Sequence, residues 1–209
     1  MARVPTLVVA TRNPGKLREM QALLGLPGLR LVSLSELGIS DEVEEGPDYA
    51  ENAARKALTA AIAAGLWAAG DDSGLEVDAL DGAPGPHSAR LAGPQRTDAD
   101  RRHTLLGLLA SYPRPWTARF RCTMALASPQ GEVELAVGVC PGQVIPVARG
   151  SGGFGYDPIF QVEGRMETMA ELSEAEKNHL SHRARAVQAL LPVLRRRLGL
   201  DAREGSSLP

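Results

Sequence analysis

Residues 119–139 read R-F-R-C-T-M-A-L-A-S-P-Q-G-E-V-E-L-A-V-G-V, and this stretch decides the fold. Apolar and polar side chains alternate on both sides of the turn sequence S-P-Q-G. An alternation with a period of two residues is typical of a strand that has one buried face, and a turn with glycine and proline joins two such strands. The stretch therefore predicts a long antiparallel hairpin with one covered face.

The N-terminal segment shows a different pattern. Residues 6–10, T-L-V-V-A, form a continuous apolar run, which predicts a strand buried on both faces. After T-R-N-P-G, three apolar residues recur at helical spacing, namely Leu17, Met20 and Leu24. A parallel strand–helix start combined with a long hairpin predicts an α/β or α+β fold with a mixed sheet.

Other segments complete the expected set of elements. The sequence predicts a strand over 29–34, an alanine-rich helix over 49–64, a strand interrupted by a turn over 67–80, and a helix from Thr97 or Asp98 to Leu109. Ser173 and Glu176 form a capping box that begins another helix. Apolar residues at helical spacing continue to Leu198, and Pro192 should kink or split that last helix.

Composition limits the class of protein. The chain has 209 residues, of which 44% are hydrophobic, and a formal net charge of −2. A near-neutral chain lacks the overall basic charge of a nucleic-acid-binding protein. Cys122 and Cys140 are too few for a disulfide framework and are expected to be core thiols. No apolar run reaches the roughly 18 residues that a membrane helix needs, so we expect a cytoplasmic protein with no membrane or nucleic-acid partner.

The sequence T-R-N-P-G-K at 11–16 joins a predicted strand to the start of a helix. The backbone N–H groups and the positive dipole end of a helix start form a ready anion site. Thr11 and Asn13 can donate hydrogen bonds there, and Lys16 can place its ammonium on a phosphate. The alternative is a helix N-cap followed by a surface lysine, and the motif alone does not decide between them.

Two acidic clusters are candidates for a metal site. Asp71 and Asp72 are adjacent in D-D-S-G, and two carboxylates that face one cavity repel each other unless a cation is present. Carboxylate, water and phosphate oxygens are the ligands that Mg²⁺ prefers. The alternative is an acidic turn in which Asp72 caps the backbone. The second cluster is D-E-V-E-E at 41–45, whose alternative is a solvated charge run.

Two further stretches carry chemistry. K-N-H-L-S-H-R at 177–183 forms either a polar helix face or a group that binds an anion or the edge of a base. S-G-G-F-G-Y-D-P at 151–158 is a turn, a phosphate cradle or a pocket wall. Together with Lys16, Lys56 and the acidic clusters, these stretches supply the parts of a metal-assisted nucleotide hydrolase.

Six motifs, in this order, resemble those of the inosine triphosphate pyrophosphatases. They are T-R-N-P-G-K-L-R-E, E-E-G-P-D-Y-A-E-N-A-A-R-K-A, D-D-S-G-L-E-V-D-A-L-D-G-A-P-G, S-A-R, G-G-F-G-Y-D-P-I-F and E-K-N-H-L-S-H-R. The resemblance implies a single domain over 1–199, and the polar residues that follow, rich in glycine and serine, predict a flexible tail over 200–209. It implies a long central mixed β-sheet flanked by helices, two lobes around a substrate cleft, and a homodimer. The implied activity is Mg²⁺-dependent hydrolysis of ITP, dITP and XTP to the monophosphate and pyrophosphate.

The resemblance also implies roles for matching positions. Asp72 would be the general base that activates water, and Asp72 and Glu44 would hold Mg²⁺. The residues that would hold the triphosphate are Thr11, Asn13, Lys16, Lys56 and Lys177. The residues that would contact the rest of the substrate are Ser73, Phe154, Gly155, Tyr156, Asp157, His182 and Arg183. Among these, Phe154 would stack on the purine, and His182 and Arg183 would read the base.

The chain departs from the family pattern at two places. The family often reads E-E-T-G-x-T-F where this chain reads V-E-E-G-P-D-Y, so Glu45 is a rival to Glu44 as a metal ligand. His87 stands where the family commonly has a tyrosine, and we expect it, like His103, to be a surface or structural residue. Two alternative functions remain, a Maf-like pyrophosphatase acting on pyrimidine or modified nucleotides and a nucleotide-binding regulator without turnover.

Overall fold

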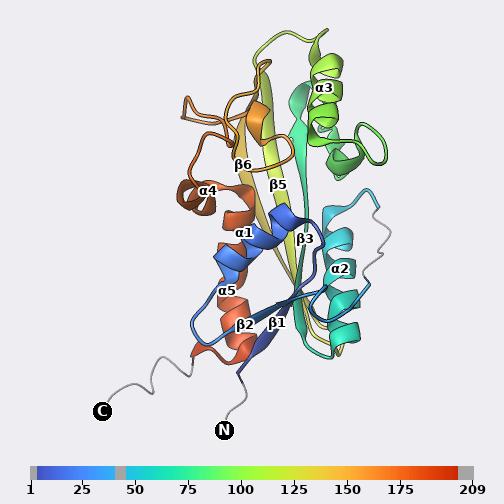
Figure 1. The fold of residues 1–209 in the computed structure, drawn as a ribbon, viewed down its shortest axis with the longest axis vertical. Coiled ribbons are helices and arrows are strands. Elements are labelled where there is room, and N and C mark those ends of the chain that lie inside the picture. Colours follow the sequence, from blue (N-terminus) through green and yellow to red (C-terminus); the bar gives the residue numbers. More distant parts are fainter. Residues whose placement is uncertain (1–3, 41–45, 202–209) are drawn as a thin grey trace, which may run out of the picture. The chain divides into compact units, whose positions relative to one another are not determined.

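The computed structural model describes residues 4–40 and 46–201, and their fold is a mixed β-sheet with flanking helices (Figure 1). The strands are β1 (Thr6–Val9), β2 (Arg30–Ser33), β3 (Trp67–Val77), β4 (Pro84–Gly85), β5 (Trp116–Ala127), β6 (Val133–Val144) and β7 (Phe160–Val162). The helices are α1 (Pro14–Leu24), α2 (Tyr49–Ala64), α3 (Asp98–Leu109), α4 (Glu174–Leu180) and α5 (His182–Leu198). The predicted α/β class is confirmed.

The sheet follows the order β2-β1-β3-β5-β6-β7, and β4 pairs with β3. Strand β1 is parallel to both β2 and β3, with Leu7 opposite Leu31 on one side and Trp67 on the other. Strand β4 is antiparallel to β3, and β7 is antiparallel to β6. The sheet is therefore mixed, as the parallel start and the later hairpin predict.

The chain divides into two compact units. Unit 1 comprises Met1–Asp72, Thr123–Val137 and Arg185–Pro209, and unit 2 comprises Ser73–Cys122 and Gly138–Ala184. Strands β3, β5 and β6 and helix α5 each contribute residues to both units. Of the tail predicted over 200–209, residues 202–209 lie outside the described residues.

In unit 1, helix α2 packs closely against the sheet through small side chains. One buried cluster contains Val8, Ala10, Val32, Leu34, Ala53, Ala57, Ala60, Ala61, Ala68, Ala125 and Ala127. A Cβ added to Gly70 of β3 would lie 3.0 Å from the backbone nitrogen of Ala57 and 3.2 Å from the carbonyl oxygen of Ala53. Helix α2 comes this close to β3 because Gly70 faces the alanine stripe of the helix, namely Ala53, Ala57, Ala60 and Ala61.

Unit 2 has a core with larger side chains. Phe120 of β5 and Phe160 of β7 are in contact, with their ring centroids 4.5 Å apart. Leu105 and Leu109 of α3 and Tyr156 are buried in the same cluster. This core supports the loop that carries S-G-G-F-G-Y-D-P, because Tyr156 belongs to both.

Most predicted elements are confirmed. The helix predicted over 49–64 is α2 itself, Thr97 caps α3, and Ser173 and Glu176 form the capping box of α4. Cys122 and Cys140 are buried free thiols.

Two structural expectations are wrong, and a third is wrong in one of its two alternatives. Strand β3 runs without interruption from Trp67 to Val77, because its two aspartates find partners on flanking elements instead of forming a turn. Helix α5 continues through Pro192, so it does not split there, and the alternative of a kink stays a prediction. The hairpin does not have one covered face, since Thr123–Ala127 are all buried while Leu135 and Val137 are about half exposed.

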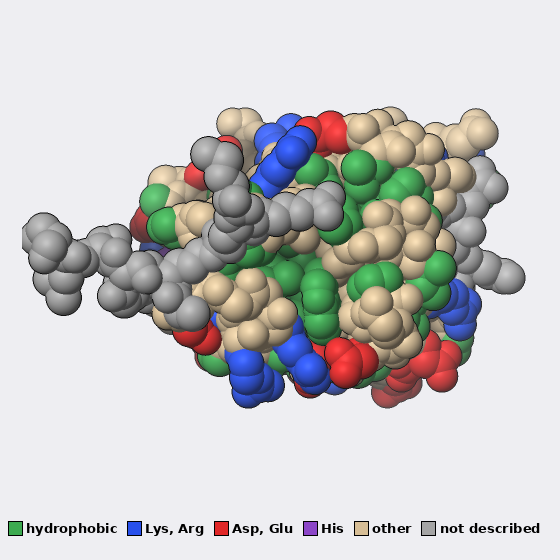
Figure 2. Space-filling model, turned by 90° about the horizontal axis from the view of Figure 1, so that it is seen from below, with side chains coloured by type: hydrophobic (Ala, Val, Ile, Leu, Met, Phe, Trp, Pro, Cys, Tyr) green, Lys and Arg blue, Asp and Glu red, His purple; other side chains and the backbone are tan. Residues whose placement is uncertain are grey.

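The surface shows mixed charge. On the face drawn in Figure 2, Lys and Arg side chains lie beside Asp and Glu side chains instead of gathering into a patch of one sign. This distribution agrees with the formal net charge of −2. Among the described residues, no helix is long and apolar enough to cross a membrane.

The contact between Gly70 and α2 generates a stability prediction. Gly70→Ala would press a methyl group against the helix backbone, and overpacking of this kind lowers the free energy of unfolding by about 1–3 kcal/mol. Urea denaturation would measure the change. Gly107→Ala is the matched control, because a Cβ there meets nothing within 4 Å inside α3. An equal loss of stability in both variants would contradict the explanation.

Candidate active site

The sequence-predicted site residues fall into two groups, one in each unit. Unit 1 contains Thr11, Asn13, Lys16, Lys56 and Asp72. Unit 2 contains Ser73, Phe154, Gly155, Tyr156, Asp157, Lys177, His182 and Arg183. Glu44 and its rival Glu45 lie outside the described residues.

Asp72 is held at both of its carboxylate oxygens by helix α2. Lys56 Nζ lies 3.0 Å from Oδ1, and the amide of Asn52 donates to Oδ2 at 3.0 Å. The two α2 residues are four positions apart and therefore on the same face of the helix. Asp72 is 3% exposed, so an ionised carboxylate there requires such donors. Lys56 and Asn52 together fix the orientation of the Asp72 carboxylate.

Asn52 also links Asp72 to the backbone that follows the acidic segment. Its Oδ1 accepts a hydrogen bond from Gly46 N at 2.7 Å, and its Nδ2 also donates to Gly46 O at 2.9 Å. Asn52 is completely buried. The sequence showed that Asn52 and Lys56 share a helix face but gave no sign that Asn52 contacts Asp72, so this residue was missed.

Asp71 has a separate partner. Lys16 Nζ lies 3.1 Å from Asp71 Oδ2, and the Asp71 side chain is fully buried. Consecutive strand residues point to opposite faces of a sheet, and Figure 1 shows α1 and α2 on either side of β3. The two carboxylates therefore lie on opposite faces of the strand, and each aspartate meets a lysine from a different helix.

The start of α1 contains features of both alternatives drawn from T-R-N-P-G-K. Asn13 is the N-cap residue, and its Oδ1 accepts hydrogen bonds from Gly15 N at 2.9 Å and Lys16 N at 3.1 Å. The Thr11 hydroxyl oxygen accepts from Asn13 N at 3.2 Å. Lys16 is not a simple surface lysine, since its side chain is 16% exposed and paired with Asp71.

In unit 2, Asp157 organises the glycine-rich loop, Gly150–Asp157. Its Oδ2 accepts from Phe154 N at 2.9 Å and from Lys177 Nζ at 2.6 Å, and both side chains of the ion pair are buried. Gly153 has φ of +69°, and a Cβ there would lie 2.0 Å from Asp157 Oδ2. A glycine is therefore required both by the left-handed backbone and by the approach of the carboxylate.

Phe154 lies beside two cations. Lys177 Nζ is 5.1 Å and Arg183 Cζ is 5.9 Å from the centroid of its ring. Arg183 is 1% exposed and donates to the Ser73 hydroxyl at 3.2 Å. The half-buried ring is thus positioned where cation–π attraction is effective, within about 6 Å of the ring centroid.

Tyr156 and His182 are packed into the core of unit 2. The Tyr156 hydroxyl donates to Ser88 O at 2.8 Å, and burial raises the pKa of the phenol, so this group stays neutral. The His182 ring stacks on Phe120 at 4.8 Å between centroids. Ser88 belongs to the S-A-R motif, and its hydroxyl donates to Gly85 O at 2.6 Å. These packed and hydrogen-bonded residues support the glycine-rich loop.

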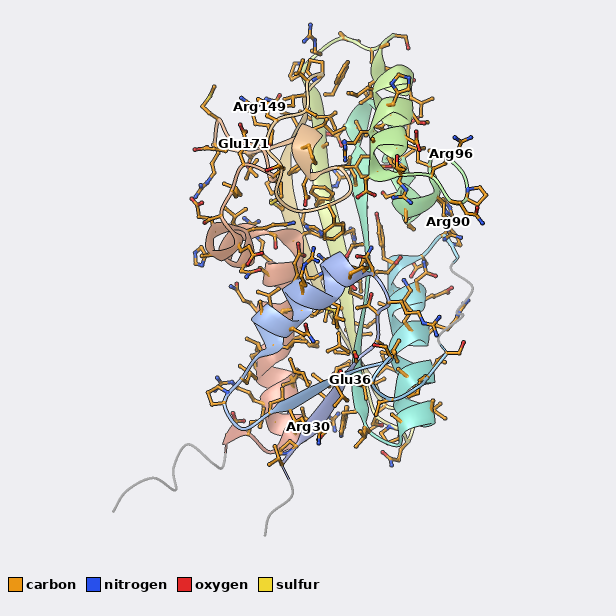
Figure 3. All side chains as sticks on the ribbon, in the orientation of Figure 1. Arg30, Glu36, Arg90, Arg96, Arg149 and Glu171 are labelled. Carbon is orange, nitrogen blue, oxygen red and sulfur yellow. The ribbon has the colours of Figure 1, made fainter. Side chains whose placement is uncertain are left out.

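The loop is also tied to neighbouring segments at both ends. The backbone oxygen of Arg149 accepts from the Thr168 hydroxyl at 2.9 Å, and Arg149 Nε lies 3.6 Å from Glu171 Oε2. Figure 3 labels these two neighbouring side chains. At the other end, Asp98 accepts from Gly155 N at 2.7 Å, and Arg102 donates to Gly155 O at 2.7 Å. Sequence reasoning missed Asp98 and Arg102, because nothing local links α3 to a glycine more than fifty residues away.

The two groups differ in the chemistry that they can perform. The unit 1 group combines an oriented carboxylate with two lysines and a helix start, which suits proton transfer and contacts with phosphate. The unit 2 group presents an aromatic ring, a guanidinium and a rigid loop, which suits a flat, hydrogen-bonding ring. Among the described residues, no cluster of three or more His, Cys, Asp or Glu side chains could hold a metal ion.

Known proteins resemble this chain over most of its length. A protein of Desulforamulus reducens named dITP/XTP pyrophosphatase is 46% identical over 192 residues, covering 91% of this chain and 96% of its own. A protein of the same name from Geobacter sulfurreducens is 51% identical over 187 residues, covering 88% and 94%. A solved HAM1 protein from Coxiella burnetii superposes with a TM-score of 0.83 at 40% identity, covering 92% of this chain and 99% of the other.

The family assignment follows from these matches together with a sequence profile. The profile of the Ham1 family matches residues 7–193, a span that contains every site residue considered above. The solved relative has the same arrangement of sheet and helices over nearly the whole chain. This chain belongs to the Ham1 family.

Proposed function

We propose that this protein hydrolyses the deaminated purine nucleotides ITP, dITP and XTP to the nucleoside monophosphate and pyrophosphate, and so removes them from the nucleotide pool. The observation that carries the proposal is the 46% identity, over 91% of the chain, to a relative named dITP/XTP pyrophosphatase. The enzyme is a nucleoside triphosphate diphosphatase, which cleaves the α–β phosphoanhydride bond.

Asp72 is the proposed general base. Its carboxylate has about four lone-pair sites, of which Lys56 and Asn52 engage one on each oxygen. The remaining sites can accept the proton of an attacking water. Water then adds to phosphorus, the α–β phosphoanhydride bond breaks, and pyrophosphate leaves. Holding the base in one orientation is favourable because proton transfer depends on geometry as well as on pKa.

Mg²⁺ is the proposed cofactor, with Asp72 and Glu44 as ligands and Glu45 as the rival to Glu44. Of these three residues, Asp72 lies among the described residues. Its buried carboxylate offers the oxygen ligands that a hard cation such as Mg²⁺ prefers. When bound, Mg²⁺ would offset the negative charge of the phosphates. Lys16, Lys56 and Lys177, with Thr11 and Asn13, are the proposed phosphate-binding residues.

We propose that the unit 2 residues bind the purine base of the substrate. Phe154 would stack on the purine, and Gly155, Tyr156 and Asp157 would line its pocket, with Ser73 also in contact with the substrate. Arg183 and His182 would read the base edge. A guanidinium has donors and no acceptor, so it favours the 6-oxo acceptor of inosine and xanthine over the 6-amino donor of adenine.

A substrate panel tests the proposal. With Mg²⁺, purified protein should release pyrophosphate from ITP, dITP and XTP at least ~10²-fold faster than from ATP, as expected where a mismatched donor is left unpaired. GTP, UTP, dTTP and methylated nucleotides complete the panel, and ion chromatography would identify the products. Preference for UTP or dTTP would favour a Maf-like activity, and release of orthophosphate alone would refute the bond assignment.

Asp72→Asn separates catalysis from binding. Removal of the base should lower kcat by about 10²–10⁴-fold, the usual contribution of general base catalysis, while the affinity for ITP stays within a few-fold in calorimetry. Asp81→Asn is the matched control, since Asp81 is exposed and its left-handed backbone tolerates asparagine. Wild-type protein that binds ITP without turnover would instead support a nucleotide-binding regulator.

We also propose that the protein works as a homodimer in the cytoplasm, where its nucleotide substrates are found. An apolar stripe on β6 supports the dimer, because Leu135 is 50% and Val137 is 46% exposed on the same face of the strand. Strand β7 pairs with Gly142–Val144, at the far end of β6 from this stripe. Adjacent exposed apolar residues of this kind mark interaction surfaces more often than single ones do.

Light scattering coupled to size exclusion tests the dimer. The wild type should elute with twice the chain mass of 22.1 kDa, and Leu135→Glu should shift the mass towards a single chain. Ile62→Glu is the control, because Ile62 is 63% exposed on α2. A monomeric wild type would refute the dimer, and a dimer that tolerates Leu135→Glu would refute this interface.

A further inference from the structure

Gly155 is held at both of its backbone polar groups by one helix. Its N–H donates to Asp98 Oδ2 at 2.7 Å, and its carbonyl oxygen accepts from Arg102 NH1 at 2.7 Å. The two side chains are four residues apart on α3, so they project from the same face one turn after the other. Both hydrogen bonds involve an ionised group, and such bonds are the stronger class.

The α3 side of this contact is itself well fixed. Thr97 and Asp100 form a complete capping box at the helix start, immediately beside Asp98. Arg101 pairs with Asp98 and restricts its side chain further. Arg102 is partly buried. Asp98 and Arg102 are therefore presented to Gly155 from a rigid element.

The loop side of the contact lies directly beside Phe154. Gly153 and Gly155 flank Phe154, and both have a left-handed backbone, with φ of +69° and +61°. Asp157 holds the Phe154 N–H, as described above. Phe154 is thus constrained at its own N–H by Asp157 and at the following residue, Gly155, by α3. A Cβ at Gly155 would meet nothing within 4 Å, so the backbone conformation, and not a lack of space, requires this glycine.

We propose that Asp98 and Arg102 are positioning residues of the nucleotide site, which place the Phe154 ring for stacking on the base by holding Gly155. The proposal rests on the function assigned to Phe154 above. It predicts an effect on recognition of the base and none on recognition of the phosphates, because Asp98 and Arg102 hold Gly155, whereas Lys177, the phosphate-binding residue of unit 2, is held by Asp157. Neither residue touches the substrate in this assignment.

Steady-state kinetics and two probes test the proposal. Asp98→Ala and Arg102→Met should each raise KM for ITP about tenfold, the equivalent of losing one charged hydrogen bond, while kcat changes less than about twofold. Binding of inosine monophosphate should weaken to a similar degree. Binding of tripolyphosphate, which has no base, should stay unchanged. Phe154→Ala removes the stacking ring, so its KM for ITP and its affinity for inosine monophosphate show how large the effect is when stacking is lost altogether.

Conservative and control variants separate positioning from a general loss of structure. Arg102→Lys keeps a cationic donor and Asp98→Asn keeps an acceptor, so both should recover part of the affinity for inosine monophosphate. Arg197→Met and Glu134→Ala are matched controls, because they break an ion pair of 2.7 Å in unit 1. These controls should leave KM unchanged.

Hydrogen exchange supplies a readout that is independent of turnover. In Asp98→Ala the Gly155 amide should exchange faster, while amides in the middle of α3 keep their protection. The double variant should cost no more affinity than the worse single variant, because both residues act on one glycine.

Three results would overturn the proposal. They are an unchanged KM for ITP, an equal loss of tripolyphosphate binding, or an unchanged Gly155 amide. If Asp98→Ala fails to fold, Arg102→Met and the two conservative variants decide. If the wild type fails to hydrolyse ITP, the proposed function fails, and the inosine monophosphate and exchange measurements still test the role of α3.

Discussion

The close packing of α2 against β3 is the constraint on which the Asp72 cluster depends. Asn52 has a short side chain, and it reaches Asp72 because Gly70 and the alanine stripe let helix and strand backbones almost touch. A larger residue on either side would separate them, and a buried carboxylate without its donors is costly. The small residues of α2 therefore matter for the site as well as for the core.

Charge is used differently in the two units. In unit 1 each aspartate of the pair has its own lysine, so Asp71 and Asp72 do not compete for one cation. In unit 2 a single carboxylate, Asp157, holds both a buried lysine and a backbone N–H of the loop. Removing one partner of a buried ion pair typically lowers the stability by about 3–5 kcal/mol. The loop conformation therefore depends on the ion pair between Asp157 and Lys177.

Local patterns in the sequence predicted the elements well, and long-range contacts explain the failures. Caps such as Ser173 with Glu176 and the bounds of α2 are visible within a few residues. Asp71 and Asp72 suggested a turn, because nothing nearby shows that lysines from two helices neutralise them inside a strand. The links from α3 to Gly155 span 57 and 53 residues and leave no local pattern. The roles of the site residues came from family resemblance and stay predictions.

The division of the chain into units has a consequence for its synthesis. Unit 1 is assembled from three separate stretches, and the last begins at Arg185, where α5 contributes the buried residues Val187, Leu190 and Leu194. Strand β1 therefore lacks part of its own unit until α5 has been synthesised. Contacts of such long sequence separation form slowly, and no truncation at a single point can yield unit 1. A polypeptide that stops before Arg185 therefore leaves β1 without the α5 side chains that belong to its unit.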